Sequence, residues 1–238
     1  MKGALRLFFP PQCLGCGEPV AEEGALCSAC WQDTEFINAH ACAQCSVPLP
    51  PGDDAGRLQC DDCLSTPRPW QDGRAVMVYH GMGRKLAMML KHGDRLDLVP
   101  ALGAWLARAG APLVRPGMIV APVPMHPRRL ISRKFNQAAM LSRRVALAHG
   151  LDHAPDLLRR TRYTPSQGQG NFAARALNQR GSVALRAAEP KAIAGKPVLL
   201  VDDVMASGAT LAAAAEALVT AGAGPVSVLV LARAVKDT

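Results

Sequence analysis

The chain of 238 residues lacks any long hydrophobic run. Its richest apolar stretch, residues 206–235, is interrupted by Glu216, by two glycines and by Pro225, so it offers no window of about 18 apolar residues for a membrane-spanning helix. The first residues also lack a secretory signal, because a short apolar piece is followed by Pro10 and Pro11 and not by a small-residue cleavage site. We therefore expect a cytoplasmic protein with no membrane span.

Cysteine is absent after residue 63, and all eight cysteines lie between residues 13 and 63. Such clustering predicts a small N-terminal module, residues 1–68, followed by a larger domain, residues 69–238. Pro67 and Pro69 fall at this boundary. Two closely spaced prolines stiffen the chain and prevent a helix from crossing it, so we interpret the boundary as a linker.

Acidic residues are scarce in one part of the chain. The formal net charge is +8, yet residues 1–72 hold four basic and ten acidic side chains, whereas residues 128–186 hold twelve basic and only two acidic ones. A concentrated basic segment predicts a site for polyanions, although a solvated helix face is the simpler alternative. Aromatic residues are also few, with three Trp, two Tyr and five Phe, which leaves few platforms for stacking single-stranded nucleic acid.

The cysteines form four CxxC pairs, and two such turns joined by a short hairpin can hold one tetrahedral zinc ion. A cytosolic chain argues against disulfides, and the common iron–sulfur spacings are tighter or unequal. We expect two structural zinc ions shared by adjacent pairs, with an interleaved pairing left open. The expected ligands are Cys13, Cys16, Cys27 and Cys30 for one ion and Cys42, Cys45, Cys60 and Cys63 for the other.

A catalytic role for this module is disfavoured, because zinc held by four thiolates has no open position for water or substrate. DNA binding by the module is disfavoured as well, since its acidic residues outnumber its basic ones. We interpret it as a support for the fold, a lid or a protein-contact surface.

Beyond residue 69, short apolar strands alternate with helical patterns. This alternation predicts an α/β fold, a parallel sheet with helices on both faces. Strands are expected at 74–80, 118–123, 197–201 and 226–231, and helices at 84–91, 96–109, 136–148 and 210–221.

The segment 198–210 carries the strongest functional signal. Asp202 and Asp203 follow four apolar residues at the expected carboxyl end of a buried strand, the edge where open parallel sheets bind ligands. The turn 206–210 offers backbone N–H groups, two hydroxyls and a helix N-terminus, which suit a phosphate dianion, and Gly208 permits close approach. The two carboxylates should face sugar hydroxyls or a metal. A Walker B strand would need a GxxxxGK[ST] loop, which the chain lacks, and an ordinary strand ending in a polar turn is the remaining alternative.

Residues 198–210 resemble the 5-phosphoribosyl-1-pyrophosphate (PRPP) motif of type I phosphoribosyltransferases. With the cysteine module and the segments 121–130, 133–137 and 164–167, nearly the whole chain resembles the ComF (ComFC/GntX-like) family. This resemblance implies a double zinc ribbon followed by a type I phosphoribosyltransferase-like sheet. It also implies an association with DNA uptake and natural transformation.

The resemblance further implies roles for individual residues. Asp202 and Asp203 would be the catalytic carboxylates near the ribose hydroxyls, and the turn around the 5-phosphate would comprise Ala206, Ser207, Gly208, Ala209 and Thr210. The proline-rich segment 122–129 is expected to be a loop after a strand and would correspond to the pyrophosphate loop. The pyrophosphate and its magnesium would then lie near Arg128, Arg129 and Arg133, with Lys134 as a further candidate. Lys91, Asn136, Gln137 and Gln167 match family positions, whereas Lys134 stands where many members have Gly, and the stretch from Gln167 to Arg175 and Asn178 departs slightly from the usual pattern.

We therefore expect a PRPP-binding protein that displaces magnesium pyrophosphate from C1 of the sugar, with an unidentified acceptor. One alternative is a non-catalytic adaptor for single-stranded DNA import that acts through residues 128–186. Another is a regulatory protein that senses PRPP. Proteins of the competence machinery are the expected partners.

Overall fold

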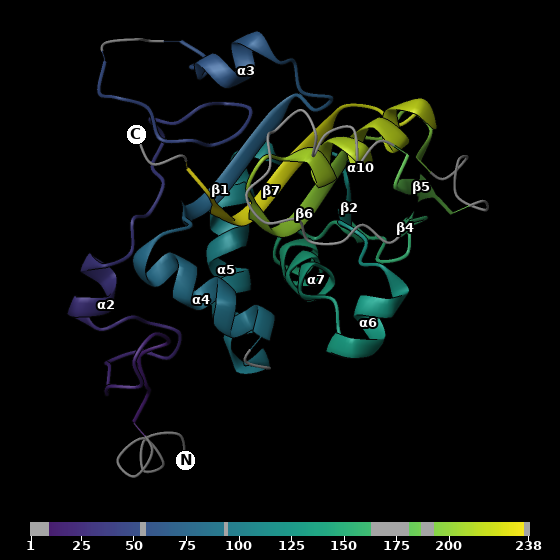
Figure 1. Ribbon diagram of the computed structural model, residues 1–238. Helices are drawn as coiled ribbons and strands as arrows, with labels where there is room; N and C mark the ends of the chain where they lie inside the picture. The colour runs from purple at the N-terminus through teal and green to yellow at the C-terminus, as the bar shows by residue number, and fades with distance from the viewer. Residues whose placement is uncertain (1–9, 53–55, 93–94, 163–180, 187–192, 236–238) are drawn as a thin grey trace.

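The computed structural model describes residues 10–52, 56–92, 95–162, 181–186 and 193–235 (Figure 1). Its centre is a five-stranded sheet in the order β1-β7-β6-β2-β3, in which every neighbouring pair is parallel. The strands are β1 (Asp72–Val78), β2 (Ile119–Pro122), β3 (Asp152–His153), β6 (Val198–Met205) and β7 (Val226–Arg233). A separate antiparallel pair consists of β4 (Leu158–Arg160) and β5 (Val183–Leu185).

Helices cover both faces of the sheet, as the alternating pattern predicts. The helices are α4 (Gly81–His92), α5 (Val99–Gly110), α7 (Gln137–His149) and α10 (Ala209–Thr220). Successive residues of a strand point to opposite faces, so Leu199 and Val201 of β6 pack in the hydrophobic cluster with α4, α5 and α7, while Val198 and Leu200 pack in the cluster with α10. Short 3₁₀ turns, Leu96–Leu98 and Ala111–Leu113, flank α5.

The N-terminal module includes two short helices, α2 (Ser28–Gln32) and α3 (Asp61–Ser65). Its first half contributes Cys13, Leu14 and Cys30 to the cluster of α4, α5 and α7, and its second half contributes Cys42, Cys45 and Cys63 to the cluster of α10. The two halves of the module therefore pack into the cores on opposite faces of the sheet. The predicted domain boundary near residue 68 stays a prediction.

The module also covers the outer edge of β1. Ile37 donates its backbone N–H to Val76 at 2.9 Å, and Val78 donates to Glu35 at 2.9 Å, so residues 35–37 run antiparallel beside the strand. Gly73 donates to the carbonyl of Ala43 at 2.8 Å further along the same edge. These bonds satisfy edge groups that would otherwise be open to another chain.

The structure corrects two local expectations. The proline-rich segment after β2 was expected to be a loop, but it contains α6 (Pro127–Arg133), because Pro127 suits the first helical position and His126 Nδ1 accepts the N–H of Arg128 at 3.2 Å. Strand β6 continues to Met205 instead of ending at Val201, because it pairs with β7 along that whole length. Asp202 and Asp203 consequently lie within the strand.

Among the described residues, no helix combines the length and hydrophobicity that crossing a membrane requires.

Candidate functional site

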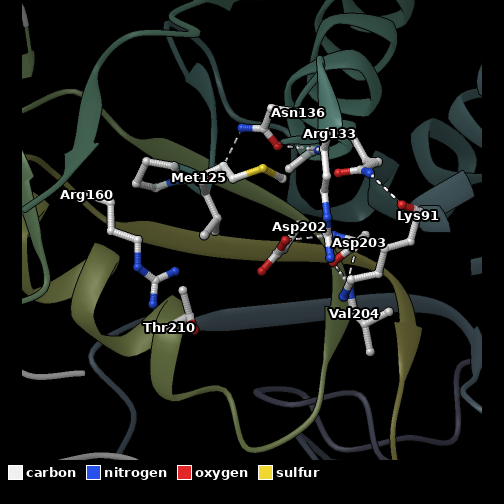
Figure 2. Close-up of a pocket in the computed structure, with 13 residues that line it drawn as sticks. Lys91, Met125, Arg133, Asn136, Arg160, Asp202, Asp203, Val204 and Thr210 are labelled. Carbon is white, nitrogen blue, oxygen red and sulfur yellow. Dashed lines mark hydrogen bonds and ion pairs between the residues drawn. The ribbon is translucent and has the colours of Figure 1, made fainter. Parts of the chain in front are cut away.

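The site lies where two neighbouring strands of the sheet connect to helices on opposite faces. Strand β2 leads through α6 into α7, which packs on the face of the sheet opposite to that of α10, the helix that follows β6. Since β2 and β6 are neighbours, the space between their carboxyl ends is a topological switch point, the usual position of a ligand in open α/β sheets. A cavity of about 180 Å³, the first cavity, opens there (Figure 2). Its lining is Lys91, Val123, Pro124, Met125, Arg133, Asn136, Gln137, Ala138, Arg160, Asp202, Asp203, Val204 and Thr210.

The acidic pair sits in the middle of this lining. Asp203 Oδ2 lies 3.6 Å from Nζ of Lys91, which comes from the last turn of α4. Burial, followed by the neighbouring charge of Asp203, raises the pKa of the Asp202 carboxyl well above its usual range. Two kinds of partner would stabilise the ionised Asp202 carboxylate: a cation, or the hydroxyl donors of a sugar. Both fit a carboxylate site of this kind.

The predicted phosphate turn forms a second cavity of about 120 Å³, which shares Asp202, Val204 and Thr210 with the first. Gly208 is the N-cap residue of α10 and has a φ of 77°, a conformation that costs glycine little and other residues more. Ser207 Oγ accepts the N–H of Ala209 at 3.3 Å. The two cavities thus place a helix N-terminus beside the carboxylates, an arrangement suited to a phosphorylated sugar.

Two arginines reach the first cavity. Arg133 at the end of α6 was predicted, whereas Arg160 on β4 was not, although it lies inside the basic segment 128–186. In Figure 2, Arg160 and Lys91 approach the acidic pair from opposite sides of the view. Arg128 is exposed on α6 and is not among the lining residues, and the side chain of Arg129 is outside the described part of the chain.

The two amide side chains have structural roles. Asn136 caps α7 by accepting the N–H of Ala138 at 3.1 Å and also donates to the carbonyl of Val123 at 3.3 Å. Gln137, 1% exposed, donates to the carbonyl of Lys91 at 3.3 Å. These bonds hold the end of α4 and the segment after β2 against α7. Gln167, Arg175 and Asn178 lie outside the described residues.

The eight cysteines, all in the described part of the chain, form two tetrads with no disulfide. The first zinc site is Cys13, Cys16, Cys27 and Cys30, and the second zinc site is Cys42, Cys45, Cys60 and Cys63, so adjacent pairing is confirmed.

The tetrads fit zinc. In each, the sulfurs lie within 4.8 Å of one another, and a tetrahedral ion with bonds of about 2.3 Å would separate them by about 3.8 Å. The Sγ atoms of Cys16 and Cys27 are 3.6 Å apart, and those of Cys45 and Cys60 are 3.5 Å apart. A hydrogen bond from Cys45 lowers the pKa of Cys42 to about 4, so this thiol readily becomes the thiolate that zinc requires.

Comparison with known proteins agrees with both modules. Residues 4–64 match the double zinc ribbon domain, and residues 141–238 match the phosphoribosyl transferase domain. The DNA utilization protein YhgH of Salmonella typhi is 33% identical over 236 residues, which cover 95% of this chain and 99% of that protein. Its counterpart in Escherichia coli K12 is 31% identical over 235 residues, with the same coverage. This chain belongs to the ComF-like family that includes YhgH.

Solved structures give weaker likenesses to the ComF-like chain. Glutamine PRPP amidotransferase from B. subtilis aligns with 60% of this chain at 22% identity and a TM-score of 0.40, and the alignment spans 30% of that enzyme. An adenine phosphoribosyltransferase aligns with 62% of this chain and 75% of its own at 18% identity and a TM-score of 0.36.

In this ComF-like protein, the two cavities therefore gather most of the residues that the sequence singled out. Lys91, Arg133 and Asp203 line the first cavity, residues 206–209 line the second, and Asp202 and Thr210 line both. The zinc ribbons and the phosphoribosyltransferase-like domain are both present, with two four-cysteine sites for structural zinc.

Proposed function

We propose that the two cavities bind PRPP together with Mg²⁺. The observation that carries this proposal is the junction of the cavities, which share Asp202 and Thr210 at the switch point of the sheet. The 5-phosphate would occupy the turn 206–210, and the ribose hydroxyls would meet Asp202 and Asp203. Arg133 and Arg160 would face the pyrophosphate.

The supported chemistry is transfer of the phosphoribosyl group. A lone pair of the acceptor forms a bond to C1 while the C1–O bond to pyrophosphate breaks, the pyrophosphate keeps that electron pair, and a proton of the acceptor passes to solvent. The residues act mainly by holding both phosphate ends and by balancing the charge of the leaving group. Magnesium, held through PRPP near the acidic pair, would add charge neutralisation.

Calorimetry with PRPP and Mg²⁺ tests the proposal. We expect the wild type to bind, and Asp202→Asn/Asp203→Asn to lose at least tenfold in affinity. Asp156→Asn is a matched control, because its carboxylate is 76% exposed and pairs with Arg186 away from the cavity. Absence of binding by the wild type, or unchanged binding by the double variant, would contradict the proposal.

We further propose that this PRPP chemistry serves DNA uptake or DNA use in the cytoplasm, with competence-machinery proteins as partners. Support comes from the relatives, which are named DNA utilization proteins. This role requires PRPP binding but names no acceptor and does not require catalysis. A PRPP-sensing role is therefore a variant of the same proposal.

Direct binding of single-stranded DNA is a second candidate function. It is favoured by the exposed positions of Arg128 and Lys134, which lie on and after α6 outside the first cavity. A gel shift at several salt concentrations tests it with Arg128, Arg129, Arg133 and Lys134 reversed in charge. Unchanged binding in that variant would contradict this role.

A further inference from the structure

Arg233, at the end of β7, connects the second zinc site with the phosphate turn. This arginine is only 6% exposed. Nε donates to the carbonyl of Cys45 at 2.9 Å, and Nη1 donates to the carbonyls of Met205 at 3.2 Å and Ala206 at 2.6 Å. One guanidinium therefore joins the backbone of a zinc ligand to the last residue of β6 and the first residue of the turn.

Arg68 makes a parallel connection. Its Nη1 donates to the carbonyl of Ser207 at 3.1 Å. Its side chain also acts to lower the pKa of the nearby Cys63 thiol, against the rise caused mainly by burial. The guanidinium lies 5.7 Å from the ring of Trp70, whose Nε1 donates to the carbonyl of Gln44 at 2.8 Å. Two arginines thus hold three consecutive carbonyls, those of residues 205, 206 and 207, beside the second zinc site.

These bonds orient the donors of the turn. In a trans peptide the C=O and the following N–H point in opposite directions. Because the carbonyls of residues 205–207 face the arginines, the N–H groups of residues 206–208 face away from them. Those N–H groups belong to residues that line the second cavity. The arginines therefore favour the turn conformation that can donate to a phosphate.

The charges at this junction are complementary. Burying a guanidinium with only carbonyl partners is unfavourable, and the ion pairs of the described residues do not include Arg233. A zinc ion with four thiolates carries a formal charge of about −2 beside it. The metal centre and the arginines should consequently stabilise each other.

The first zinc site has no such connection within the described residues. Its half of the module contacts the start of α4, where Met82 donates its N–H to Asp33 at 3.1 Å and Met82 Sδ lies against Gly15. In the described part of the chain, the hydrogen bonds of this half do not reach residues 202–210. The chain thus contains an internal comparison for any effect of the second site.

We propose that Arg233, assisted by Arg68, is a positioning residue through which zinc at the second site and phosphate at the turn raise each other's affinity. The proposal rests on the phosphate role of the turn proposed above. Coupling between two sites is reciprocal, so a bound phosphate must lower the dissociation constant of zinc by the factor by which zinc lowers that of the phosphate. We expect the tighter zinc binding to appear as slower zinc loss. We expect a factor of about 10, within the usual range of such couplings.

Zinc release from the full chain to a chromogenic chelator tests the coupling. Ribose 5-phosphate is a suitable probe, because it carries the phosphate that the turn would hold and needs no Mg²⁺. Its binding is first measured by calorimetry. With saturating probe, we expect one of the two zinc ions to leave about tenfold more slowly and the other to leave at its original rate.

Arg233→Lys keeps the charge but cannot bridge Cys45 and the turn, so we expect it to lose the protection. Arg57→Gln is the matched control, since Arg57 belongs to the same half of the module but pairs with Asp72 and not with the turn. It should keep the protection. If Arg233→Lys does not fold, the wild-type measurement and Arg68→Gln, which should also reduce the protection, still test the coupling.

Equal slowing of both ions, or of neither, in a wild type that binds ribose 5-phosphate would overturn the coupling while leaving the proposed function intact. Retained protection in a folded Arg233→Lys variant would overturn it as well. A wild type that binds neither ribose 5-phosphate nor PRPP would overturn both proposals.

Discussion

Lys91 and Asp203 form an ion pair across the first cavity, with Nζ 3.6 Å from Oδ2. The pair joins the last turn of α4 to β6, and the Asp203 side chain is only 13% exposed. It therefore places a positive charge beside two adjacent carboxylates, Asp202 and Asp203, at the point where a negatively charged ligand would enter.

Replacing Lys91 by Gln should weaken PRPP binding about tenfold and lower the melting temperature. The reason is that Asp203 would remain partly buried without its countercharge, and the acidic pair would repel the phosphates. Calorimetry and thermal unfolding measure the two effects. Lys85→Gln, an exposed position on the same helix, should change neither. Equal effects of the two substitutions would contradict the prediction.

Asp202→Asn should raise the stability of the ligand-free protein near neutral pH. The folded state raises the pKa of Asp202 above its usual value of 3.8, so stability is lost as the pH rises from about 3.8 through the raised pKa. An asparagine does not ionise and removes this loss. For each ~1 kcal/mol recovered, the melting temperature should rise by about 2–4 °C.

Thermal unfolding between about pH 4 and pH 8 checks this sign. The gap between Asp202→Asn and the wild type should be largest at the upper end and should shrink toward pH 4. Asp156→Asn, whose carboxylate is exposed, should show no such trend. A variant that is less stable than the wild type at pH 7 would refute the assignment.

Arg160→Gln should weaken PRPP binding about tenfold, because Arg160 lines the first cavity and can balance pyrophosphate charge. Arg159 is the neighbouring residue on β4, but its side chain is exposed and outside the lining. Arg159→Gln should therefore bind PRPP as the wild type does. Calorimetry on the two variants makes the comparison, and equal losses would indicate a general charge effect.

Gly208→Ala should lower both stability and PRPP affinity. Its φ of 77° costs a residue with a side chain about 1–2 kcal/mol, and the added Cβ would lie 3.2 Å from Trp70. Gly117→Ala is a matched control, since Gly117 has a φ of 69° in open space. It should lose similar backbone stability in thermal unfolding but keep its PRPP affinity in calorimetry. Retained affinity in Gly208→Ala would show that the turn does not hold the phosphate.

Local patterns predicted much of the fold and the centre of the site. The apolar run before Asp202 predicted β6, and the small residues from Ala206 predicted the turn into α10, because both signals lie within one short segment. The CxxC spacing similarly predicted the two zinc sites, since each pair of turns is close in sequence.

Contacts between distant segments escaped prediction. Arg160 enters the cavity because β4 pairs with β5, and three-residue strands give too little pattern to recognise. Arg233 and Cys45 lie 188 positions apart in the sequence, and no local pattern at either residue predicts the hydrogen bond between them. Such placements depend on how the whole sheet assembles.

The position of β7 between β1 and β6 has a consequence for biosynthesis. Among the described strands β7 comes last in the chain. During translation, the inner edge of β1, which pairs with β7 in the folded protein, therefore stays unpaired until β7 leaves the ribosome. Its outer edge can already be covered by residues 35–37, which are made first. A nascent or truncated chain that ends before residue 226 would therefore expose one edge of β1, on the inner side alone, to aggregation or to chaperones.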